Sequence, residues 1–143
     1  MGQSFVPTLP HLNVVELQMN SQSSAAGGVA VVRIRSGSVT GAILGVSEPA
    51  IIPPVMLPVD VVHFDFSAPV PLEPGSPHVI EVVATAGTLG VFGARISEDS
   101  PPGTAIAFGT EQPRDALWFR EGISYPESVE RSSWGRAPRS TDR

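Results

Sequence analysis

The stretch "DVVHFDFS", residues 60–67, alternates apolar and polar side chains over most of its length. The apolar set is Val62, Phe64 and Phe66, and the polar set between them is His63 and Asp65. Because successive side chains of a β-strand point to opposite faces, this pattern predicts a strand with one buried and one wet face.

The same alternation extends outward from this stretch over most of the chain. Further strands are expected at 12–20, 29–37, 41–49, 78–86, 89–97, 103–111 and 116–122. Turn-rich segments such as "SEPAIIPP", residues 47–54, separate them, and the 15 prolines and 14 glycines recur too often for ordinary helices. The chain is therefore predicted to be all-β, a single jelly-roll β-sandwich of about eight antiparallel strands.

Length and composition divide the chain into two parts. Its 143 residues suit one domain, predicted at 1–125, followed by an extended C-terminal arm at 126–143. The arm is rich in proline, serine and arginine and has too few apolar residues to fold alone. The chain has no cysteine, which excludes disulfides and thiolate metal sites.

Charge narrows the classes of partner. The net charge is -5, and residues 1–125 hold most of the acids, which argues against nucleic acid as a partner. There is no run of roughly 18 apolar residues and no secretory signal pattern, so we expect no membrane partner. Because no secretory signal pattern is present, we expect the protein to reach the outside of the cell either as part of a larger assembly such as a virion or after lysis.

Several pieces of the sequence occur in a familiar order. They are "QSFVPTLPHLNVVELQM" at 3–19, "VVRIRSGSVTGAILGVS" at 31–47, "VHFDFSAPVPLEPGSPHVIEVV" at 62–83, "PPGTAIAFG" at 101–109 and "DALWFREG" at 115–122. Together they resemble the galactose-binding-like jelly-roll modules of bacterial extracellular and phage structural proteins. The resemblance spans about residues 3–123 and implies the fold, whereas such folds host many unrelated functions.

Catalytic and cofactor chemistry finds little support in the sequence. The turn around Ser47 lacks the second glycine of a serine-hydrolase elbow, and the three histidines are too scattered to form an imidazole metal site. We therefore expect no catalytic residues and no cofactor. The one exception left open is a structural calcium ion at the loop that contains Glu98, Asp99 and Ser100.

A polar strand face is the first candidate binding surface. If their strands are sheet neighbours, six polar side chains would converge on it, and Trp118 would add an aromatic platform for a sugar. The six are Glu16, Gln18, Arg33, Arg35, His63 and Asp65. The alternative to a binding surface is a solvent-exposed face on which these side chains form salt bridges with one another.

The arm is the second candidate surface. Trp134 is flanked by Arg131, Arg136 and Arg139, and tryptophan and arginine are the residue types that dominate interface hot spots. The alternative is a disordered end. We expect a non-enzymatic structural or decoration module on the exterior of a large assembly such as a phage virion. It would attach through its arm and edge strands to other protein subunits, as a homo-oligomer.

A carbohydrate-binding module excised from a secreted bacterial protein is the alternative function. In that case a glycan would be the partner, and the arm would be a linker.

Overall fold

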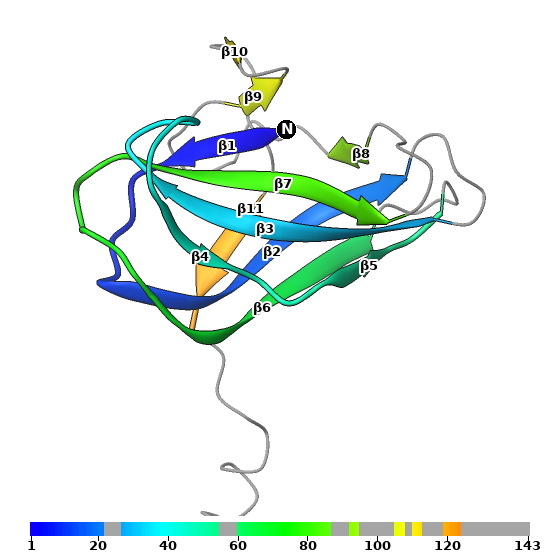
Figure 1. Ribbon diagram of the computed structural model, residues 1–143, viewed down its shortest axis with the longest axis horizontal. Helices are drawn as coiled ribbons and strands as arrows, with labels where there is room; N and C mark the ends of the chain where they lie inside the picture. Colours follow the sequence, from blue (N-terminus) through cyan, green and yellow to red (C-terminus); the bar gives the residue numbers. More distant parts are fainter. Residues whose placement is uncertain are drawn as a thin grey trace, which may run out of the picture.

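The computed structural model describes residues 1–21, 27–54, 60–86, 92–94, 105–107, 110–112 and 119–123. All regular structure in these ranges is β (Figure 1). The strands are β1 (Gly2–Phe5), β2 (His11–Ser21), β3 (Gly28–Ser36), β4 (Ile43–Val46), β5 (Ala50–Ile52), β6 (Asp60–Pro71), β7 (His78–Ala86), β8 (Phe92–Ala94), β9 (Ala105–Ala107), β10 (Thr110–Gln112) and β11 (Phe119–Gly122). No helix in this part of the chain is long and apolar enough to cross a membrane.

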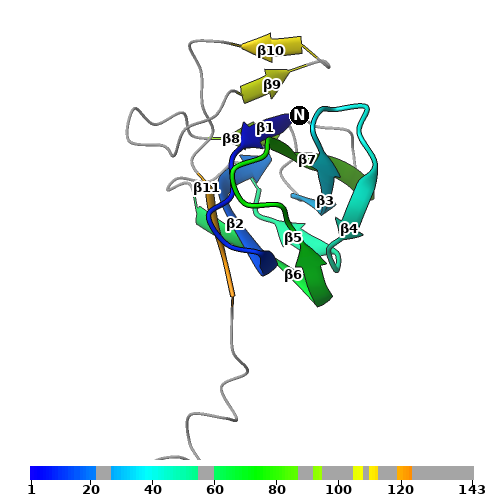
Figure 2. The same cartoon turned by 90° about the vertical axis from the view of Figure 1, so that its left-hand side faces the viewer.

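The strands form two antiparallel sheets that pack face to face. Sheet A has the order β10-β9-β1-β7-β3-β4, with β5 also paired to β3, and sheet B has the order β11-β2-β6, with β8 also paired to β2. In Figure 1, β2 and β6 run obliquely beneath β3 and β7, and Figure 2 shows the two layers nearly end-on. The predicted β-sandwich is confirmed.

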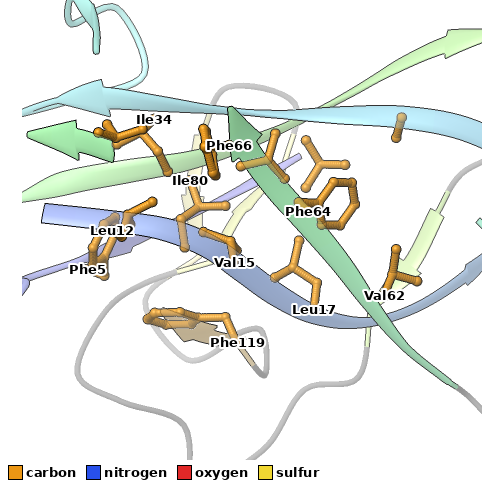
Figure 3. Packing of buried hydrophobic residues seen from close by; sticks show 14 of the residues in the cluster. Phe5, Leu12, Val15, Leu17, Ile34, Val62, Phe64, Phe66, Ile80 and Phe119 are labelled. Carbon is orange, nitrogen blue, oxygen red and sulfur yellow. The ribbon is translucent and has the colours of Figure 1, made fainter. Parts of the chain in front are cut away.

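The long strands alternate between the two sheets along the chain. β2 and β6 pair in sheet B, while β3 and β7 pair in sheet A. The inner faces of these four strands supply most of the core, because each contributes apolar side chains at every second position. Figure 3 shows side chains of β2 and β6, among them Val15, Leu17 and Phe64, pointing toward Ile34 and Ile80 of sheet A.

An irregularity in the pairing of β2 with β6 changes which side chains of β2 face the core. The register with β6 shifts between Leu12 and Val14: this step of two residues in β2 faces a step of five residues in β6, from Val70 to Asp65, so the extra residues lie in β6. Leu12 therefore faces the core together with Val15 and Leu17, and all three are buried. Simple alternation would have placed Leu12 on the outer face.

The edge of sheet A folds close to sheet B. A Cβ atom added at Gly45 in β4 would lie 2.5 Å from Cγ2 of Val70 in β6, so any larger residue would force these strands apart. Beyond β4, the backbone N–H of Glu48 donates to the carbonyl oxygen of Asp65 at 2.8 Å. The segment between β4 and β5 therefore contacts β6 of sheet B, although both of these strands belong to sheet A.

Some strand predictions differ from the structure. The described part of the chain has eleven strands rather than about eight. The single strand expected at 103–111 is wrong, since β9 and β10 lie antiparallel to each other within and just beyond that range. Neither β1 nor β5 was predicted: β1 is held by pairing with the distant β7 and β9, and β5 lies in the proline-rich segment expected to be a turn.

Candidate functional site

A cluster of three charged or ionisable side chains lies on the outer face of sheet B. The register pairs Glu16 of β2 with His63 of β6 on one side and with Arg120 of β11 on the other. Arg120 Nε donates to Glu16 Oε2 at 2.5 Å, and a second guanidinium nitrogen contacts the same oxygen. His63 Nδ1 lies 3.2 Å from Glu16 Oε1. Each carboxylate oxygen thus has its own partner.

The position of Glu16 explains its electrostatics. Its residue is only 8% exposed, whereas the side chains of Arg120 and His63 are more than half exposed. The hydrogen bond from Arg120 lowers the pKa of Glu16 below its ordinary value, against an opposing effect of burial. The charges of Arg120 and His63 lower this pKa further, so Glu16 is a firmly ionised carboxylate between two exposed partners.

A groove of about 500 Å³ runs along the side of the sandwich next to this cluster. Its walls are β5 with the segments on either side of it, and β6. Its lining is Glu48, Pro49, Ala50, Ile51, Pro53, Val61, Val62, His63 and Asp65. Two carboxylates and one imidazole therefore stand beside an apolar wall of proline and isoleucine.

Backbone and hydroxyl hydrogen bonds hold one wall of the groove in place. Ser47 is buried, and its Oγ accepts from the N–H of Val32 at 2.9 Å and donates to the carbonyl oxygen of Glu48 at 2.9 Å. The N–H of Ser47 donates to the carbonyl oxygen of Val32 at 2.8 Å. With the Glu48–Asp65 backbone bond, these contacts place both acidic residues at the same point of the groove.

A second charged cluster lies on the outer face of sheet A. Arg35 Nε donates to Glu81 Oε2 at 2.8 Å, and Arg35 also donates to the carbonyl oxygen of Gly41 at 2.9 Å. Arg33 lies 3.9 Å from the same glutamate oxygen. Glu81 therefore forms its stronger ion pair with Arg35 and a weaker, longer one with Arg33.

This division corrects the predicted ligand face. Glu16, His63 and Asp65 lie on neighbouring strands of sheet B, with Gln18 on the same strand as Glu16. Arg33 and Arg35 do not join them, because β3 pairs with β7, β4 and β5 in the other sheet. The alternation fixes which side of a strand is wet but carries no information about which sheet a strand joins.

The other predicted site residues lie outside the described residues. They are Trp118, Arg131, Trp134, Arg136 and Arg139, and the calcium loop with Glu98, Asp99 and Ser100. Within the ranges that the structure does describe, no three histidine or acidic side chains gather into a group suited to a metal ion.

Exposed apolar side chains follow the two short strands at the edge of sheet A. Ile43 and Val46 of β4 are 47% and 49% exposed, and Ile51 of β5 is 80% exposed. Ile43 and Val46 pair in register with Arg35 and Arg33, so they share the outer face with those arginines. Ile51 also lines the groove, which makes this edge the region where apolar surface and the acidic groove meet.

Glu121 has the opposite environment to Glu16. It lies one residue after Arg120 on β11 and pairs with Val15, so it points inward beside the core. Burial raises the pKa of Glu121, offset in part by a hydrogen bond from the backbone of Thr8. Its Oε2 atom is buried without a hydrogen-bond partner among the described residues.

No family model, no curated protein and no solved structure matches this chain.

Two residues of the site were not among the predicted binding residues. One is Arg120, whose contact with Glu16 joins positions 104 residues apart. Glu48 lies in a proline-rich segment expected to be a turn, and its contact with Asp65 arises where the segment between β4 and β5 lies against β6. Neither long-range contact leaves a local signal in the sequence.

Proposed function

We propose that this protein is a non-enzymatic structural module of a larger protein assembly, such as the exterior of a phage virion. It attaches through segment 126–143 and through the edge strands of its sandwich. The observation that carries the proposal is the set of exposed apolar side chains Ile43, Val46 and Ile51 on the edge strands β4 and β5, since exposed apolar surface is a common mark of protein contact sites.

The position of these side chains also supports the proposal. Among the described strands, β4 and β5 are the last on their side of sheet A, and each pairs only with β3. An edge strand of this kind offers backbone groups for pairing with another chain, and apolar side chains beside it add burial to such a contact. The resemblance to galactose-binding-like modules of phage structural proteins points to the same kind of role.

Segment 126–143 supplies the second attachment. It contains Trp134 and four arginines, which are residue types that carry much of the binding energy of protein interfaces. In a symmetric assembly each copy both gives and receives such contacts, so individually modest contacts add up to firm attachment.

Sedimentation of the full chain over a range of concentrations tests this function. We expect complexes of more than one copy at micromolar concentration, and Trp134→Ala should weaken association by about thirtyfold while leaving the thermal unfolding midpoint unchanged. Trp134→Phe, which keeps an aromatic ring, should retain most of the association. A chain that stays monomeric at every concentration would contradict the proposal.

A carbohydrate-binding module is the second candidate function, supported by the polar cluster on sheet B. The exposed side chains of Arg120 and His63 lie on one face with Glu16 between them, and such polar groups can hydrogen-bond to sugar hydroxyls. A glycan array tests it: bound sugar that is lost in Glu16→Gln would favour this function, and an array without signal would exclude the glycans it carries.

A further inference from the structure

The groove between β5 and β6 combines an apolar wall with negative charge. Pro49, Ile51 and Pro53 form the wall, and Ile51 is largely exposed. Among the described lining residues, the ionisable ones are Glu48, Asp65 and His63, and none is an arginine. His63 is already engaged with Glu16 through Nδ1. The groove therefore suits a segment that carries both a cation and a large apolar side chain.

Segment 126–143 of this chain has that composition. Its stretch "RSSWGRAPR", residues 131–139, contains three arginines and one tryptophan and no acidic residue. Arginine binds carboxylates through two parallel hydrogen bonds, and a tryptophan ring packs well against proline and isoleucine. Charge and apolar character of this stretch thus both complement the groove.

Spacing also agrees with an extended bound conformation. Side chains two positions apart in an extended chain point the same way, so Trp134 and Arg136 would face one surface together, about 6.6 Å apart along the chain. The described part of β6 that lines the groove runs from Val61 to Asp65, which spans about 13 Å. About four extended residues fit beside it, enough for the Trp134–Arg136 pair.

We propose that the groove receives residues 131–139 of a second copy of this chain. Trp134 packs on Pro49, Ile51 and Pro53, and Arg136 pairs with the carboxylates of Glu48 and Asp65. The inference rests on the proposed assembly function and names the surface that receives the arm. Repetition of the contact from copy to copy makes it a head-to-tail interface, which closes into a ring or continues as an open array.

A charge-exchange experiment on the full chain tests this contact. Glu48→Arg and Arg136→Glu should each weaken self-association by about tenfold or more in sedimentation, because each places like charges together. The double variant Glu48→Arg/Arg136→Glu restores opposite charges and should recover most of the association. Glu73→Arg is the matched control: it makes the same charge change at an exposed turn position remote from the groove lining and should associate like the wild type.

The outcomes separate the inference from the function on which it rests. If Trp134→Ala loses association while Glu48→Arg keeps it, the arm binds another surface; the inference is overturned and the assembly function stands. If Glu48→Arg loses association and the double variant Glu48→Arg/Arg136→Glu does not recover it, the groove receives a different partner. The inference is then also overturned. Thermal unfolding of each variant confirms that the sandwich is intact, as expected for the exposed side chain of Glu48.

Discussion

The two faces of sheet B are made by neighbouring residues of the same strands, yet they hold very different interactions. On the inner face, Val15 and Phe64 are fully buried against sheet A. On the outer face, Glu16 follows Val15, His63 precedes Phe64, and the two meet through an ion pair whose histidine is mostly exposed. The inner face holds the fold together, whereas the outer face is free to change without loss of the fold.

This difference indicates that binding surfaces are to be sought on the outer face and along the groove, where substitutions cost little stability. Buried apolar contacts contribute several kcal/mol each, while exposed ion pairs contribute roughly 0–1 kcal/mol. Substitutions on the outer face and along the groove should therefore change binding without changing the fold. That separation is what makes the association experiments interpretable.

The largest expected effect is on the inner face. Phe64→Ala should lower the free energy of unfolding by about 3–5 kcal/mol, because it leaves a cavity in the centre of the core. Asp65→Ala, at the next and exposed position, should change it by less than about 0.5 kcal/mol. Urea unfolding of both variants measures the contrast, and similar losses at the two positions would mean that the assigned faces are wrong.

A smaller effect is expected at Glu121, which lies on the inner side of β11. Its buried Oε2 atom has no hydrogen-bond partner among the described residues. Its pKa is raised in the folded state, so ionisation opposes folding, and stability should fall as the pH rises through the ordinary and then the raised value. Glu121→Gln should stabilise the protein at neutral pH by about 1 kcal/mol or less, since the side chain is partly exposed to screening water. Unfolding midpoints of the wild type and of Glu121→Gln, measured from acid to neutral pH, test this direction. A variant that is less stable than the wild type at neutral pH would contradict it.

The smallest effect is expected at Glu16 on the outer face, and its pH dependence has the opposite sign. Its pKa is lowered in the folded state, so its contribution is complete above the ordinary value of 4.5 and is lost as the pH falls through the lowered value. Glu16→Gln should cost about 0.5–1 kcal/mol at neutral pH. Arg120→Gln should lower stability in the same direction, and a double variant that is no less stable than either single variant would show that the pair acts together.

Much of the sandwich could be predicted from local pattern. β2, β3, β6 and β7 each alternate over many residues, and Val62, Phe64 and Phe66, the apolar set predicted for β6, are buried. β1 and β5 were missed because they are short and are held by pairing with distant strands. Local sequence cannot report such pairing.

The site was predicted only in part, for the same reason. Glu16 and His63 were expected to meet, and they do. The separation of Arg33 and Arg35 from them, and the approach of Arg120 and Glu48, depend on which strands become neighbours. That choice is made by tertiary packing of all the strands, and period-two alternation is the same in either sheet.

A photo-crosslinking measurement tests the central claim, that Trp134 of one copy occupies the groove of another. A chain with a photoreactive phenylalanine analogue in place of Trp134 is mixed with an isotopically heavy wild-type chain and irradiated. The account predicts cross-links from position 134 to heavy peptides that contain residues 48–53 or 61–65. Cross-links found only within the probe-bearing chain, or only to other surfaces of the heavy chain, would contradict it.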